Sequence, residues 1–468
     1  MMGFDRVIQG GTIYTATDTY EADIGIEDGE IKQIGEGLPT DGADVIDADD
    51  KQVLPGPMDV HVHFNLPFCG TVSKDDYDNG AKAAARGGLT TLVDYGFQDE
   101  ETGSLIDGVE RKLSEEMDGI SPIDYSVHGA VMDWTDEVSG ELAELAEEGI
   151  TSNKMFMIYS EEGWQATDQD LLEHLQRTEE LGTTLLVHHE TDEIMQKLIE
   201  QTWEKHGKEI GAYGLVEAKP PLVEASAVQR TMELAEYTGG RIYVVHTSTG
   251  KAANIAKRAQ DRGVDLFMET CTQYLMFNDS VFKRDDGHLF ATAPQIKSEQ
   301  DRQRLWEGLE DGEVQIVATD TCTFDTEQKS MWEGDFREIP LGMPGVETLF
   351  PVFYTEAYKE RGFSLNKVVQ KVSSNPSKIL GMNPQKGTIA VGTDADLIVV
   401  DPEKTETVRA DTWRTDCDWC PYEGESLYGF PDYTLVRGKP IVRDGEIQED
   451  TNGHGKRIKR KTGGQLDV

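Results

Sequence analysis

Short apolar runs alternate with longer amphipathic stretches through the middle of the chain. There are eight such runs, each of a length that suits one buried strand. They are PMDVHVHF (57–64), LTTLVDYG (89–96), IDYSVHGAV (123–131), SNKMFMIY (152–159), TTLLVHHE (183–190), RIYVVHTS (241–248), DLFMETCTQYL (265–275) and VQIVATDT (314–321). Helical-looking stretches such as 141–149, 170–182 and 225–240 lie between them. This alternation predicts an α/β fold, a parallel (β/α)8 TIM barrel over residues 54–384.

The two ends of the chain follow another pattern. Residues 1–53 and 385–447 alternate apolar and polar positions in short runs that glycine and aspartate interrupt. Such runs are typical of small antiparallel β-structure. We therefore expect both ends to build one small β-sandwich domain together. The tail that follows, 448–468, is basic, and we expect it to pack against acidic surface of its own chain or of a neighbouring subunit rather than to bind a polyanion.

The charge balance narrows the classes of partner. The chain has 468 residues, with 88 Asp and Glu against 44 Lys and Arg, and a formal net charge of −44. This charge repels nucleic acid and anionic membranes. Because the charges also repel one another unless salt screens them, we expect a protein that works at high ionic strength, an ordinary acidic protein being the alternative. No apolar run nears the roughly 20 residues of a membrane span, and no secretory signal opens the chain, so we expect a cytoplasmic location.

The five cysteines do not predict a disulfide framework, because their number is odd and they are sparse. Cys417 and Cys420 form one C-x-x-C pair without further metal ligands nearby. We therefore expect two thiols in a loop.

Polar side chains recur where the apolar runs end. His61 and His63 close the first run, and in a strand residues i and i+2 point the same way. Histidines also close two later runs, at 188–189 and 246, and Asp320 closes the last. In such barrels the carboxyl ends of the strands form the active face, and a carboxylate is costly to bury unless it meets a cation. The pattern predicts a metal site.

Lys154 stands within a strongly apolar run. A buried lysine needs a partner, a shifted pKa or a chemical modification, and the residues alone leave these three open.

Several segments together resemble the dihydropyrimidinase and hydantoinase branch of the cyclic amidohydrolases. The resemblance runs from about residue 4 to 461 and rests on motifs that include LPGPMDVHVHFNLPFCGTVSKDDY, NKMFMIY, VHHE, VVHTS, TDTCTFDTEQK and KGTIAVGTDADLIVVDP. It implies two Zn²⁺ ions per subunit, bridged by carboxylated Lys154. The implied ligands are His61, His63 and Asp320 for the first ion and His188 and His246 for the second. The resemblance also makes Asp320 the catalytic base and Tyr159 the group that stabilises the oxyanion.

The same resemblance places residues around the substrate. Thr292 and Leu341 match positions that meet the substrate amide largely through the backbone, and they differ from the family's usual residues there, as do Thr321 and Lys219. Asn65 stands where dihydroorotase-like relatives have an arginine that grips a carboxylate. The pocket rim offers Leu66, Phe68 and Phe156, which favours a neutral or apolar-substituted ring.

The expected reaction is the opening of a cyclic amide or imide, a 5,6-dihydropyrimidine or a 5-substituted hydantoin, at its C–N amide bond. Allantoin is the alternative substrate, and a non-catalytic assembly protein is the alternative class. Relatives form tetramers or dimers, and we expect a homotetramer.

Overall fold

The eight expected strands form one parallel barrel in the computed structural model, which describes residues 3–466. Around the barrel the strands follow one another in chain order: β8 (Met58–Asp59), β11 (Thr91–Phe97), β12 (Asp124–Ala130), β13 (Ser152–Phe156), β14 (Thr184–His188), β15 (Ile242–Val244), β16 (Leu266–Cys271) and β17 (Ile316–Ala318). A parallel bridge between Val62 and Thr321 joins the segment after the last strand to the segment after the first. The His63 amide donates to the Thr321 carbonyl at 2.7 Å, so the barrel is closed.

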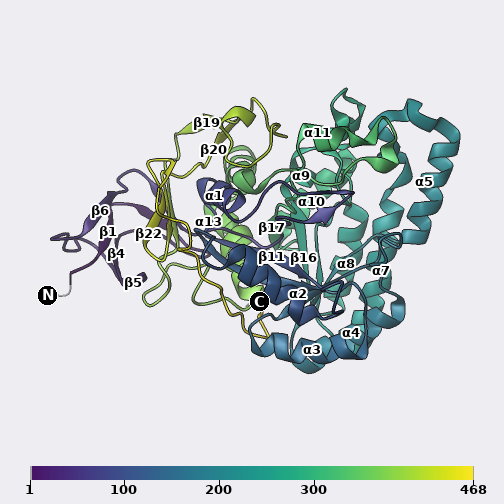
Figure 1. Ribbon diagram of the computed structural model, residues 1–468. Helices are drawn as coiled ribbons and strands as arrows, with labels where there is room; N and C mark the ends of the chain where they lie inside the picture. Colours follow the sequence, from purple (N-terminus) through teal and green to yellow (C-terminus); the bar gives the residue numbers. More distant parts are fainter. Residues whose placement is uncertain (1–2, 467–468) are drawn as a thin grey trace.

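Helices cover the outside of the barrel (Figure 1). The longer ones are α1 (Asn79–Arg86), α2 (Leu105–Arg111), α3 (Asp136–Glu147), α4 (Asp168–Leu181), α5 (Asp192–His206), α7 (Pro221–Thr238), α8 (Gly250–Asp261) and α10 (Glu299–Asp311). Helix α4 shows why such segments become helices. Thr167 and Asp170 form a capping box at its start, Leu171 and Leu175 are buried, and Gly182 ends it with φ of 65°.

Shorter helices complete the barrel: α6 (Gly214–Ala218), α9 (Thr272–Met276), α11 (Thr326–Lys329), α12 (Leu349–Phe353), α13 (Leu365–Val369) and α14 (Asn375–Ile379). Within residues 3–466, no helix has both the length and the apolar character that crossing a membrane requires.

Both chain ends contribute to a small two-sheet domain, as expected. One sheet contains β3 (Thr19–Glu21), β2 (Thr12–Tyr14), β7 (Gln52–Pro55), β18 (Leu397–Val400), β21 (Tyr433–Val436), β22 (Lys439–Arg443) and β23 (Glu446–Ile447). The other contains β6 (Asp44–Asp47), β1 (Arg6–Gln9), β4 (Asp23–Glu27) and β5 (Glu30–Gly35). Ile8 and Ile24 of the second sheet share a core with Ile13, Val53 and Leu397 of the first. The exact domain boundaries stay predictions.

The expectation of purely antiparallel pairing in this domain was wrong at two places. Strand β1 runs parallel to β6, and β2 runs parallel to β7. A period of two in the sequence fits either direction, and the chain between the paired strands is long enough for the crossover that parallel pairing needs.

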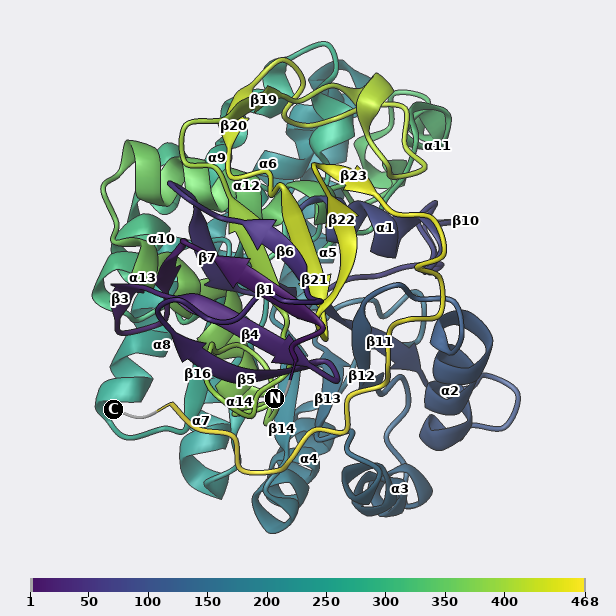
Figure 2. The ribbon, with the colours of Figure 1, turned by 90° about the vertical axis from the view of Figure 1, so that its left-hand side faces the viewer.

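The basic tail packs against its own chain, across the amino ends of the barrel strands (Figure 2). Ile458 donates to the Tyr125 carbonyl at 2.7 Å, Arg460 to Gly149 at 3.0 Å and Gly463 to Gly182 at 3.0 Å, all through backbone amides. The buried Arg460 guanidinium also donates to Ser152 Oγ at 2.6 Å and to the Val127 carbonyl. The tail therefore packs against the barrel and covers the end at which its strands begin.

Deleting residues 456–468 should lower the thermal stability of the protein. The deletion removes several backbone hydrogen bonds, each worth about 1 kcal/mol, and exposes the end of the barrel at which its strands begin. We expect the melting temperature to fall by about 5 °C in a calorimetric scan. Lys459→Gln is the control, because its pair with Glu148 is 61% and 55% exposed and an exposed ion pair adds little to stability. An unchanged melting temperature in the deletion variant would contradict a supporting role for the tail.

Candidate metal centre

The first group of predicted ligands comes together where the barrel closes. His61 and His63 follow β8, and Asp320 follows β17. Asp320 Oδ1 lies 3.2 Å from His61 Nε2 and 3.3 Å from His63 Nε2. One ligand atom from each residue lies within 4.8 Å of the others, a spacing that can hold a metal ion. Parallel strands explain this convergence, because their carboxyl ends meet at one rim.

The remaining predicted ligands lie beside this group. Lys154 on β13 places its Nζ 3.0 Å from His61 Nε2. His188 ends β14 and His246 follows β15, and His188 Nδ1 lies 3.0 Å from His246 Nε2. The rings of His61 and His246 are 5.4 Å apart, so the two groups form one cluster. All six predicted ligand positions therefore meet at one end of the barrel.

Three residues of the site have left-handed backbone conformations. Tyr159 has φ of 74°, His246 of 37° and Asp320 of 55°. Such conformations are uncommon for residues other than glycine and cluster at functional sites, where the surrounding structure holds them in place.

Two buried carboxylates that the sequence reasoning missed fix the proton positions of two histidines. Glu269 Oε1 lies 2.8 Å from His61 Nδ1, and Glu190 Oε2 lies 3.0 Å from His188 Nε2. An ionised carboxylate only accepts, so each of these ring nitrogens carries the proton when its glutamate is ionised, and the opposite nitrogen then turns a lone pair toward the cluster. A carboxylate within an apolar strand is costly unless it is paired, and this signal could have revealed Glu269.

The donor set fits a metal ion. His61 Nε2 and Asp320 Oδ1 are both acceptors and face each other at 3.2 Å, an arrangement that a cation between them stabilises. Burial also lowers the pKa of all four candidate histidines, which keeps the imidazoles neutral as metal binding requires. Burial raises the pKa of Asp320 and lowers that of Lys154, while the attraction between the two side chains opposes both shifts.

The two buried carboxylates differ in their electrostatic surroundings. Burial raises the pKa of Glu269 to about 8, while the hydrogen bonds from His246 and Tyr243 lower it. Burial opposes ionisation of Glu190 as well, but Lys219 and the bond to His188 lower its pKa to about 2. A cation in the cluster would favour the ionised form of both.

A compact pocket opens onto the cluster, and its walls include the predicted substrate residues. These are Leu66, Phe68, Phe156, Tyr159, Thr292 and Leu341. Trp164, which the sequence reasoning missed, is the centre of the aromatic wall: its ring lies 5.7 Å from those of Phe97, Phe156 and Tyr159. The tryptophan follows a turn without periodicity, so no pattern in the sequence pointed to it.

Other predicted positions lie outside the ligand cluster. His189 turns away from the cluster, with Nε2 2.9 Å from Thr231 Oγ1. Thr292 donates its hydroxyl to the Pro294 carbonyl at 2.7 Å, and the Leu341 amide points at Cys69 Sγ, 3.5 Å away. Lys219 is buried and accepts, through its carbonyl, from Lys297 at 2.8 Å.

Two further groups of possible ligands do not form metal sites. Asp124, Asp394 and Asp396 converge, but the ammonium of Lys386 lies among all three. Cys417 and Cys420 are buried free thiols, as are Cys271 and Cys322, and Cys69 is a partly exposed free thiol.

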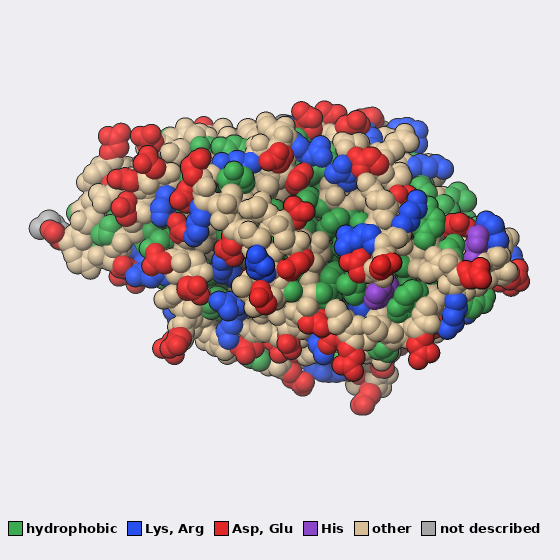
Figure 3. Space-filling view, turned by 90° about the horizontal axis from the view of Figure 1, so that it is seen from above, with side chains coloured by type: hydrophobic (Ala, Val, Ile, Leu, Met, Phe, Trp, Pro, Cys, Tyr) green, Lys and Arg blue, Asp and Glu red, His purple; other side chains and the backbone are tan. Residues whose placement is uncertain are grey.

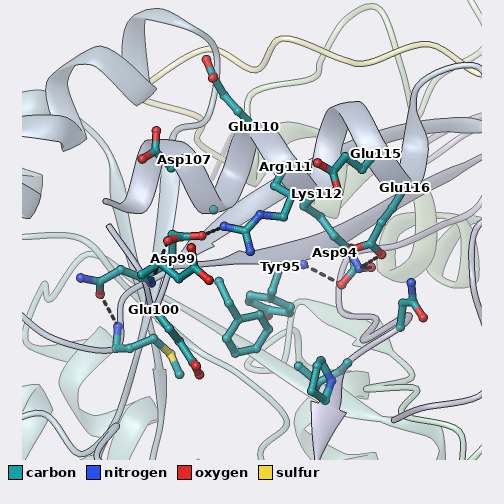
Figure 4. Close-up of a pocket in the computed structure, with 18 of the residues that line it drawn as sticks. Asp94, Tyr95, Asp99, Glu100, Asp107, Glu110, Arg111, Lys112, Glu115 and Glu116 are labelled. Carbon is teal, nitrogen blue, oxygen red and sulfur yellow. Dashed lines mark hydrogen bonds and ion pairs between the residues drawn. The ribbon is translucent and has the colours of Figure 1, made fainter. Parts of the chain in front are cut away.

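A larger cavity of about 1040 Å³, drawn in Figure 4, adjoins the pocket. The two share Leu66, Phe97 and Trp164. Its walls carry the acidic residues Asp94, Asp99, Glu100, Glu101, Asp107, Glu110, Glu115 and Glu116. Arg111 pairs with Asp99, and Lys112 pairs with Glu116 at 2.8 Å. Acidic groups outnumber these two cations, so the cavity disfavours anions near the pocket.

Comparison with known proteins assigns this arrangement to a family. A model of the amidohydrolase family matches residues 52–441. The chain belongs to the amidohydrolase family. The matched range contains all eight barrel strands and all six candidate ligand positions.

Individual amidohydrolases resemble the chain over nearly its whole length. D-hydantoinase of Geobacillus stearothermophilus is 37% identical, with 98% of each chain covered. D-phenylhydantoinase of Escherichia coli is 32% identical, with 97% of this chain and 98% of that protein covered. The crystal structure of dihydropyrimidinase from Brevibacillus agri superposes with a TM-score of 0.95 at 34% identity, over 98% of this chain and 100% of that one. The chain is therefore a cyclic amidohydrolase of this branch, and the predicted fold is confirmed.

Proposed function

We propose that the protein hydrolyses a cyclic amide or imide at its C–N amide bond, and that the substrate is a 5,6-dihydropyrimidine or a 5-substituted hydantoin. The convergence of six metal-ligand positions beside one aromatic-walled pocket carries this proposal. The relatives named D-hydantoinase and dihydropyrimidinase support the ring chemistry.

We propose two Zn²⁺ ions as the cofactor, with Lys154 carboxylated to bridge them. The ligands would be His61, His63 and Asp320 for the first ion and His188 and His246 for the second. When bound, the two ions supply Lewis acidity and an activated water. The donor set described above supports this assignment.

The side chains around the pocket supply the remaining steps. The Asp320 carboxylate takes the proton of the attacking water and passes it to the leaving ring nitrogen. The Tyr159 hydroxyl donates a hydrogen bond to the substrate carbonyl oxygen as negative charge develops there. Phe68, Phe156 and Trp164 exclude water and leave room for a neutral ring with an apolar substituent.

The charges near the pocket favour neutral rings over carboxylated ones. Asn65 offers no positive charge, and the adjoining cavity is acidic. Dihydroorotate, which carries a carboxylate, is therefore disfavoured.

Allantoin hydrolysis is the alternative reaction. A non-catalytic assembly role is the alternative class, but all six ligand positions are occupied by residues that can bind metal.

The assembly and the location of the protein are proposed from the sequence. We propose a homotetramer, with a dimer as the alternative, in the cytoplasm, and no nucleic-acid or membrane partner.

A turnover assay on zinc-loaded protein tests the function. Dihydrouracil, 5-substituted hydantoins, allantoin and dihydroorotate would be compared by kcat/KM, with metal content measured on the same sample. We expect the highest kcat/KM with dihydrouracil or a hydantoin and the lowest with dihydroorotate. Turnover of none of these rings by a chain that holds two metal ions would refute the proposal, and a preference for allantoin would select the alternative reaction.

Tyr159→Phe should lower kcat by about 100-fold, because it removes one donor to the oxyanion. KM should change much less, since the hydrogen bond strengthens only as charge develops. Tyr354→Phe is a matched control: its buried hydroxyl donates to Gln52 at 2.7 Å, outside the pocket. A rise in KM at constant kcat would instead make Tyr159 a binding residue only.

We also propose that the protein is adapted to high ionic strength. Acidic side chains spread over the face seen in Figure 3, with fewer Lys and Arg between them. At a net charge of −44 their mutual repulsion opposes the compact state unless salt screens it.

Raising KCl from about 0.1 M to about 2 M should therefore raise the melting temperature, because the Debye length shortens below the spacing of surface charges. Sucrose at equal osmolality is the control, since it stabilises without screening charge. A melting temperature that is flat in KCl would contradict salt adaptation.

A further inference from the structure

Each half of the candidate metal centre includes a histidine that is hydrogen-bonded to a buried carboxylate, and that carboxylate is not itself a candidate ligand. Glu269 and Glu190 have no exposed surface. Each lies within hydrogen-bond distance of the histidine nitrogen that faces away from the cluster, at 2.8 Å from His61 and 3.0 Å from His188. Both contacts join a glutamate carboxylate to a histidine ring nitrogen. Glu269, however, contacts residues of both halves of the centre, whereas Glu190 contacts one half.

We propose that Glu269 and Glu190 are positioning residues that set how tightly the two metal ions are held, with Glu269 acting on both ions and Glu190 on the second alone. The inference rests on the proposed two-metal function. It goes beyond that function in assigning separate roles to two residues outside the ligand set.

Glu269 connects the two halves of the centre. Its Oε1 accepts from His61 Nδ1 at 2.8 Å and from the backbone amide of His246 at 2.9 Å. Its Oε2 accepts from the Tyr243 hydroxyl at 2.8 Å, which fixes the carboxylate in one orientation. One side chain on β16 thus orients the imidazole of a first-ion ligand and holds the left-handed backbone of a second-ion ligand.

Glu190 acts locally. It lies two residues after His188, and the Oε2 contact to that ring at 3.0 Å is its hydrogen bond to the cluster. Its other oxygen, Oε1, has no hydrogen-bond partner among residues 3–466. A change at Glu190 should therefore reach the second ion through His188 and leave the first ion unaffected.

His63, unlike His61 and His188, has no carboxylate hydrogen-bonded to its outer ring nitrogen among the described residues. Its Nδ1 has no hydrogen-bond partner in the described part of the chain. The ring is held instead by stacking on Tyr95, with centroids 4.7 Å apart and planes inclined by 18°. A hydrogen-bonded carboxylate raises the basicity of a histidine ligand and fixes its tautomer, whereas stacking fixes orientation alone.

Metal affinity separates this role from a purely structural one. Glu269→Gln and Glu190→Gln keep the shape of each side chain and remove its charge. Glu347→Gln is the matched control, because Glu347 is a buried carboxylate, 4% exposed, that accepts from the Arg414 amide at 2.7 Å and contacts no candidate ligand. Zinc dissociation constants would be measured by chelator competition, and the absorption bands of the cobalt-loaded protein would report ligand geometry.

We expect Glu269→Gln to weaken both ions by about 10- to 100-fold and to shift the cobalt bands, whereas Glu190→Gln weakens one ion by a similar factor. Glu347→Gln should leave both constants unchanged. Wild-type constants in either folded glutamine variant would overturn the inference. If Glu269→Gln does not fold, the selective loss of one ion in Glu190→Gln still decides the inference for that residue. A wild-type chain that binds no zinc would instead refute the proposed function.

Discussion

Closure of the barrel between its first and last strands is the contact on which the candidate metal centre depends. The hydrogen bond from the His63 amide to the Thr321 carbonyl, at 2.7 Å, fixes the register of two segments far apart in the chain. That register places Asp320 Oδ1 between the rings of His61 and His63, 3.2 and 3.3 Å from their Nε2 atoms. In an open sheet these segments would lie at opposite edges, and Asp320 would be far from His61 and His63.

Several kinds of contact offset the free-energy cost of burying polar groups inside an apolar barrel. Burial keeps the imidazoles neutral. Glu269 and Glu190 form hydrogen bonds with the ring nitrogens of His61 and His188 that face away from the cluster. Left-handed backbone at His246 and Asp320 turns each side chain toward the cluster. These costs are acceptable at a site where bound cations would stabilise the anionic and lone-pair donors.

The charges of the molecule have distinct roles at its two ends. Near the pocket, the acidic cavity around Glu100 and Glu110 disfavours anions. At the opposite end, the tail brings Arg460 beneath the barrel, where the guanidinium donates to Ser152 on β13, the strand that also carries Lys154. The basic tail thus packs within the chain, as expected from the sequence.

The sequence by itself predicted the barrel and a metal site, because apolar runs of strand length ended in histidines and Asp320 and such ends meet at one rim. Lys154 entered the candidate ligand set only through the family resemblance. The sequence did not determine the direction of β1 and β2, since a period of two fits parallel and antiparallel pairing equally. Only the tertiary structure decided the role of Trp164, whose ring partners come from separate loops and strands, and the contacts of Glu269. A hydrogen bond between residues on different strands leaves no local pattern, so folding alone reveals it.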